Sequence, residues 1–309
     1  MGFFRRRSSD TPTPVPDPVF PALSTDDVAW IRRTAGAVLA ARGVEATLES
    51  DGATFTAADG YRISLDNAVA TCAALPREEW VGYLEQHFGA MAGATALPRI
   101  EDLTPEQLRA QIRTRILPTN ALGSAEIDLS GYARPVADGL WAVLCVDFPE
   151  TVSYVSPATA ARLPDLDEAF RIGQTNTDAE PIDDVHHYDN GLIGVSGESV
   201  FIASKAMNPA ALLAQTVGHD APHGIVFAVP DRSSVLLHVI EDIGAVEAIG
   251  SLAAVADQVY AESTYTVSPR IYHWYRDTIT DIGGVNADRS GITVTPSDDL
   301  VAILNRLAE

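Results

Sequence analysis

The densest group of metal-binding residue types in the chain is the segment 183–189, which reads Asp-Asp-Val-His-His-Tyr-Asp. In an extended strand, alternate side chains face opposite sides, so Asp184 and His186 would share one face. A catalytic zinc ion usually takes three ligands from the protein, so further ligands would have to come from elsewhere. His219 and His223 could supply them, although a glycine and a proline within 218–222 indicate a turn there. A metal-dependent hydrolase that uses these four residues is therefore the alternative function; polar loop residues without a cofactor are the favoured interpretation.

A second candidate is the Pro-Asp-Arg-Ser turn at 230–233, which lies between two apolar runs. Pro230 restricts φ, and the Asp231 side chain can accept hydrogen bonds from the amides that follow it. Arg232 would then project a planar guanidinium group from the tip of a hairpin, where it could bind a carboxylate of a partner. Shaping the turn is the ordinary role of such residues. If the turn also binds a partner, Arg232 and Asp231 are the expected contact residues.

Other catalytic patterns in the chain are incomplete. The segment 194–198 (Gly-Val-Ser-Gly-Glu) departs from the nucleophile pattern G-x-S-x-G, because a glutamate replaces the last glycine. The segment 176–187 begins like a calcium-binding loop, but Pro181 stands where that loop needs glycine. Cys72 and Cys145 lie among apolar residues, where we expect buried thiols. The sequence therefore assigns no catalytic residue.

Acidic residues outnumber basic ones in this chain. It has 42 Asp and Glu against 21 Lys and Arg, a formal net charge of −21 at pH 7. Such a field repels phosphate backbones and suits a basic protein partner, so we expect no nucleic acid. No apolar run is long enough to span a membrane, and no apolar signal-type segment follows the first seven residues. We expect a cytoplasmic protein without membrane insertion.

Hydrophobic periodicity predicts an α+β fold. The proline-rich residues 1–23 are expected to form a disordered tail. The pattern of 24–120 predicts a helix, an antiparallel meander with two Asp-Gly turns, and further helices that end at residue 116. Small polar residues at 121–131 predict a linker or loop. The remainder, 132–309, is expected to form a C-terminal α+β domain with a β-hairpin and a long amphipathic helix at 244–261.

Three segments of the C-terminal half carry a family resemblance. They are 169–176 (Ala-Phe-Arg-Ile-Gly-Gln-Thr-Asn), the hairpin at 225–237, and 267–272 (Val-Ser-Pro-Arg-Ile-Tyr). Together they resemble the YtpQ-like family, a group of bacterial intracellular proteins without an assigned activity, over about residues 140–276. The resemblance implies a cytoplasmic α+β protein. With the acidic surface and the incomplete catalytic patterns, it favours a non-catalytic binding or interaction module.

Overall fold

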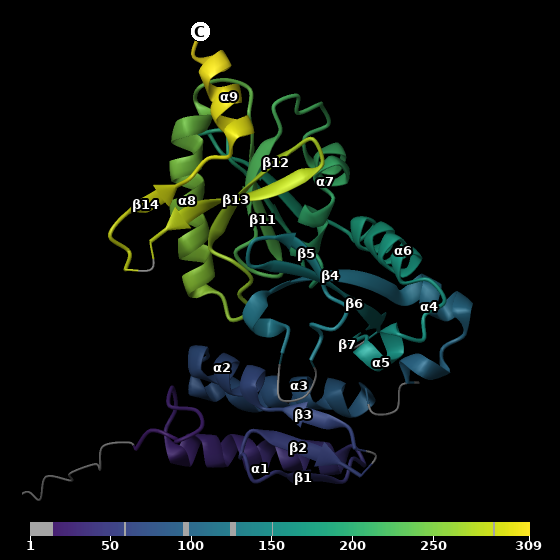
Figure 1. Ribbon diagram of the computed structural model, residues 1–309. Helices are drawn as coiled ribbons and strands as arrows, with labels where there is room; N and C mark the ends of the chain where they lie inside the picture. The colour runs from purple at the N-terminus through teal and green to yellow at the C-terminus, as the bar shows by residue number, and fades with distance from the viewer. Residues whose placement is uncertain (1–14, 59, 95–98, 124–127, 150, 287) are drawn as a thin grey trace, which may run out of the picture. The chain divides into compact units, whose positions relative to one another are not determined.

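The computed structural model describes residues 15–58, 60–94, 99–123, 128–149, 151–286 and 288–309 (Figure 1). The chain divides into two units, Met1–Leu97 and Pro98–Glu309, and each is described by itself. This division lies earlier than the predicted boundary at 121–131. The segment Ile112–Pro118 is strand β4, which pairs along its whole length with β6 (Leu140–Phe148), although the sequence pattern predicts residues 112–116 as the end of a helix. Residues 98–131 therefore belong to the second unit.

The first unit packs helices on a small antiparallel sheet, as the sequence predicts. Its elements are α1 (Thr25–Ala41), β1 (Ala46–Leu48), β2 (Thr54–Ala57), β3 (Arg62–Ser64), α2 (Asp66–Ala74), η1 (Arg77–Glu79) and α3 (Trp80–Ala94). The strands form a meander in the order β1-β2-β3. The Ser24 hydroxyl accepts a hydrogen bond from the amide of Asp27 and so caps α1. Apolar residues at helical spacing on α1 then form one side of the core.

Residues 15–23 pack against α1, which corrects the prediction of a disordered tail over 1–23; residues 1–14 lie outside the described residues. The carboxylate of Asp17 accepts hydrogen bonds from the amides of Val19 and Phe20, at 2.9 and 3.0 Å. Arg32 on α1 donates to the same carboxylate at 3.2 Å, and Phe20 is part of the hydrophobic core. The prolines predicted disorder because they remove amide donors, but these buried contacts offset the ordering entropy.

The second unit contains a seven-stranded antiparallel sheet with the strand order β14-β13-β12-β10-β11-β9-β8. Its strands are β8 (Asp184–His187), β9 (Ile193–Ser196), β10 (Ile225–Ala228), β11 (Ser234–Val239), β12 (Arg270–Tyr275), β13 (Thr278–Val285) and β14 (Ile292–Val294). Helices α8 (Ala245–Glu262) and α9 (Asp298–Leu307) cover one face (Figure 1). The predicted α+β fold, with its hairpin and long amphipathic helix, is confirmed.

A four-stranded sheet covers part of the other face. Its strands are β4, β5 (Arg134–Ala137), β6 and β7 (Thr151–Tyr154), with β6 paired to all three others. The accompanying helical elements are η2 (Ile100–Asp102), α4 (Pro105–Gln111), η3 (Thr119–Ala121), α5 (Pro157–Ala160), α6 (Leu166–Asp178), η4 (Ala203–Met207) and α7 (Pro209–Thr216). Alternate residues of β10 explain the two cores, because Val226 faces α8 while Phe227 packs with Ile116 and Leu140.

The outer edge of β4 is occupied by side chains rather than by another strand. The amide of Thr114 donates to the hydroxyl of Thr177 at 3.1 Å, and that hydroxyl lies 3.1 Å from the Thr114 carbonyl. The amide of Ile116 donates to the Ser204 hydroxyl at 3.0 Å. Helix α6 and η4 therefore satisfy polar groups that would otherwise be open to pairing with another chain.

Candidate functional site

The four residues of the alternative metal site do not form a metal centre. Asp184 and His186 lie on β8, an edge strand of the large sheet, whereas His219 and His223 lie between α7 and β10. The His219 ring is 3.9 Å from the carboxylate of Glu241. Across the part of the chain that the structure describes, no three His, Cys, Asp or Glu side chains come together in a way that could hold a metal ion. The geometry gives the hydrolase no support.

The two cysteines and the only lysine are buried. Cys72 and Cys145 are free thiols, as expected, and burial raises the pKa of Cys72 to about 11 and that of Cys145 to about 12. Lys205 donates to the carbonyl of Asp178 at 2.7 Å and to the amide oxygen of Gln215 at 3.2 Å. Burial also lowers the pKa of Lys205. Its ammonium group joins segments of the fold and is not presented to solvent.

The predicted turn at 230–233 connects β10 and β11, whose pairing runs from Ile225 opposite Val239 to Ala228 opposite Leu236. Asp231 shapes this turn, because its Oδ1 accepts hydrogen bonds from the Ser233 amide (2.9 Å) and the Ser234 hydroxyl (2.8 Å).

The turn is not the free loop tip that the sequence predicts. The amide of Arg232 donates to the carbonyl of Tyr265 at 3.2 Å, and the carbonyl of Arg232 accepts from the amide of Ala203 at 3.1 Å. The amide of Val267 donates to the carbonyl of Pro230 at 2.9 Å. Two other segments therefore hold the turn on both sides and fix the direction of the Arg232 side chain.

The guanidinium group of Arg232 is half-buried against an aromatic ring. Its Cζ lies 3.4 Å from the ring centroid of Tyr265, a close cation–π contact. Its Nε is buried and has no hydrogen-bond partner. Burial lowers the pKa of Arg232, and repulsion from Arg115 adds to this shift. The side chain is thus a desolvated cation with unused donor capacity.

Arg115, on β4, is the second basic residue of this site. Its Cζ lies 5.5 Å from the ring centroid of Tyr154 on β7. Burial raises the pKa of Tyr154, while the positive charges of Arg115 and Arg232 oppose that rise. Sequence reasoning missed Arg115 because it assigned residues 104–116 to a helix. The available signal was the alternation of β4, where buried side chains alternate with half-buried arginines at 113 and 115.

We name Arg115, Tyr154, Arg232 and Tyr265 the arginine pair site. The neighbouring Arg113 is not part of it, because its guanidinium group pairs with Glu180 at 2.9 Å. By contrast, neither Arg115 nor Arg232 forms an ion pair with any carboxylate of the described residues. Chemically, two planar guanidinium groups without a counter-ion can donate hydrogen bonds to an anion that has several acceptor oxygens, such as a carboxylate.

Comparisons with known proteins add no relative. No protein-family model matches the chain, and neither the curated proteins nor the solved structures gave a significant match. The resemblance to the YtpQ-like family stays a prediction. No helix in the described ranges is both long and apolar enough to cross a membrane.

Proposed function

We propose that the protein is a non-catalytic binding module that holds a carboxylate of a basic protein partner in the arginine pair site. The observation that carries the proposal is which arginines are buried without an ion-pair partner. Nine arginines of the described ranges form ion pairs, and those that do not are exposed to solvent, except Arg115 and Arg232. In a chain with 42 acidic residues, two half-buried neighbouring cations without a counter-ion favour a site for an external anion.

The net charge indicates what kind of molecule would bring that anion. A formal charge of −21 repels a small free anion at long range but attracts a basic protein. A carboxylate displayed by such a protein, at its C-terminus or on a side chain, would be carried to the site by the partner's positive charge. Long-range attraction and local recognition then act on the same partner. A cytoplasmic location is part of this proposal.

Two synthetic peptides test the proposal. Both are short and rich in lysine and serine; one ends in a free carboxylate and the other in an amide. We expect the free acid to bind the full-length protein roughly tenfold more tightly than the amide, because a charged hydrogen-bonded pair is lost in the amide. Arg115→Gln and Arg232→Gln should each remove this preference while both peptides keep their salt-sensitive background binding.

Arg306→Gln is the matched control, because Arg306 is exposed on α9 and its loss changes the net charge equally. This variant should keep the preference for the free acid. Equal affinities of the two peptides for the unmodified protein would refute the proposal, as would an equal loss of the preference in the Arg306 variant. Thermal melting of each variant confirms that it is folded.

A further inference from the structure

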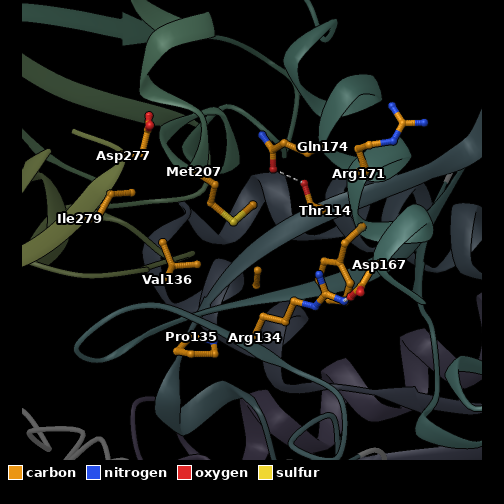
Figure 2. A pocket seen from close by; sticks show the side chains of 12 residues that line it. Thr114, Arg134, Pro135, Val136, Asp167, Arg171, Gln174, Met207, Asp277 and Ile279 are labelled. Atoms are coloured by element: carbon orange, nitrogen blue, oxygen red, sulfur yellow. Dashed lines mark hydrogen bonds and ion pairs between the residues drawn. The ribbon is translucent and has the colours of Figure 1, made fainter. Parts of the chain in front are cut away.

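A separate pocket of about 420 Å³ lies in the second unit, where α6, β5, η4 and the turn between β12 and β13 meet (Figure 2). Thr114 of β4 lines it. Because successive residues of a strand point to opposite faces, the neighbouring Arg115 points away from this pocket. The pocket and the arginine pair site are therefore on opposite faces of the same strand.

One wall of the pocket is apolar. Val136, Met207 and Ile279 are partly buried and pack against the core of the second unit. Figure 2 shows these three side chains together on one side of the pocket. Such a wall suits the methylene groups of a ligand, since the apolar surface of both partners leaves water.

The opposite wall is polar but already satisfied. The side-chain amide of Gln174 accepts from the Thr114 hydroxyl at 2.6 Å and donates to the Asp178 carboxylate at 2.7 Å. The amide donors and acceptor of Gln174 are therefore already used in hydrogen bonds within the protein, so they contribute little to binding a ligand. Charged recognition has to come from the ends of the pocket.

At one end of the pocket, Arg134 has nitrogen donors that an anion could use. Its Cζ lies 4.0 Å from the ring centroid of Phe170, and its Nη2 is bonded to the carboxylate of Asp167. In the described residues, Nε and Nη1 of Arg134 have no hydrogen-bond acceptor. An arginine stacked on a ring and held at one nitrogen loses little conformational entropy when its other nitrogens bind a carboxylate.

At the other end, Asp277 offers a carboxylate. It forms no ion pair or hydrogen bond with any residue that the structure describes. Asp277 and its neighbour Arg276 both have positive φ, 63° and 49°, in the turn between β12 and β13. A two-residue hairpin turn requires positive φ at both central positions, so this conformation follows from the pairing of Tyr275 with Thr278 and fixes the backbone position of Asp277.

Figure 2 places Asp277 and Arg134 at different ends of the pocket, with Val136 and Met207 between them. We propose that this pocket binds a small zwitterion with an ammonium group and a carboxylate at opposite ends of an apolar body, such as an ω-amino acid or a short apolar peptide. The ammonium group pairs with Asp277, the carboxylate pairs with Arg134, and the body packs on the apolar wall. This site goes beyond the proposed function and does not depend on it.

Three matched ligands test each end: 6-aminohexanoate has both charges, hexylamine only the ammonium group, and hexanoate only the carboxylate. Calorimetric titration of the full-length protein should show 6-aminohexanoate binding roughly tenfold more tightly than either analogue. Asp277→Asn should weaken 6-aminohexanoate and hexylamine roughly tenfold and leave hexanoate unchanged. Arg134→Gln should do the reverse, weakening 6-aminohexanoate and hexanoate but not hexylamine.

The Asp277→Asn variant should fold like the unmodified protein, because asparagine tolerates positive φ at position 277 as well as aspartate does. Arg276→Gln, on the same turn but outside the pocket, should leave all three affinities unchanged, and so should Arg306→Gln on α9. Equal binding of the three ligands, no saturable binding of any, or an unchanged affinity in Asp277→Asn would each overturn the proposal. Binding of the carboxylate ligands that is lost in Arg232→Gln but retained in Arg134→Gln would place them at the arginine pair site and would also overturn the proposal.

Discussion

The substitution Asp17→Ala should destabilise the first unit, because this carboxylate holds the segment 15–23 on α1. Its side chain is only 1 % exposed, so water cannot replace the lost hydrogen bonds. Burial raises the pKa of Asp17, but the amides of Val19 and Phe20 together with Arg32 lower it below its usual value, so the carboxylate is charged at neutral pH.

The size of the loss follows from these contacts. Hydrogen bonds to a charged group contribute about 1.5–3 kcal/mol each, but bonds that share one carboxylate are not additive. We expect Asp17→Ala to lower the free energy of unfolding of the first unit by about 3 kcal/mol. Asp17→Asn should lose only about 1 kcal/mol, because its remaining oxygen still accepts from both amides while the contact with Arg32 is lost.

Hydrogen exchange followed by mass spectrometry on the full-length chain measures the two units separately. Amides of α1 should exchange roughly 100-fold faster in Asp17→Ala, and those of α8 should be unchanged. Glu85→Ala, which removes an exposed carboxylate from α3, is the control and should alter neither helix. Unchanged exchange of α1 in Asp17→Ala would show that residues 15–23 do not stabilise the first unit.

Three further predictions concern groups inside the two units. Burial lowers the pKa of His87 and of His273 below the ordinary value of 6.5. In acid, the unfolded chain therefore binds more protons than the folded chain. The free energy of unfolding is highest above that pH and should fall between about pH 7 and pH 5. A urea midpoint that does not change with pH over this range would contradict the assignment. Lys205→Met removes a buried ammonium group at nearly constant volume, so we expect the free energy of unfolding at neutral pH to change by less than about 1 kcal/mol. A loss above about 3 kcal/mol would show that the hydrogen bonds of Lys205 outweigh the cost of desolvating its ammonium group. Gly173→Ala would place a methyl group 3.1 Å from the backbone of β4. Urea unfolding should therefore show that the free energy of unfolding falls by about 1–3 kcal/mol. An unchanged urea midpoint would show that α6 can shift to accommodate the methyl group.

Local turn chemistry explains which parts of the fold could be predicted. The Asp-Gly pairs at 51–52 and 59–60 indicate the meander, and the Pro-Asp turn at 230–231 indicates the hairpin. These signals depend on a few adjacent residues, so tertiary contacts seldom override them. Residues 200–203 form an apolar run of strand length, yet they form turns that lead into η4, because a short apolar run does not distinguish a buried strand from a buried turn.

Strand β4 shows why the rest was missed. A genuine helix start precedes it, since Thr104 and Gln107 form a capping box and Pro105 follows the cap. Only at Ile112 does the spacing of apolar residues change from helical to alternating, and the strand depends on pairing with β6, far along the chain. The same error concealed Arg115, so half of the arginine pair site was predicted through Arg232 and half was not. Contacts between distant segments leave no local pattern to read.

The hydroxyl groups that cover the edge of β4 also matter while the chain is being synthesised. Thr177 and Ser204 are translated after the strand whose amides they bond, so a nascent chain presents that edge uncovered until both have emerged. In that interval a neighbouring nascent chain could pair with the same amides and compete with correct folding. The edge of β4 is therefore most open to pairing with another chain during synthesis, before α6 and η4 have formed, rather than in the finished fold.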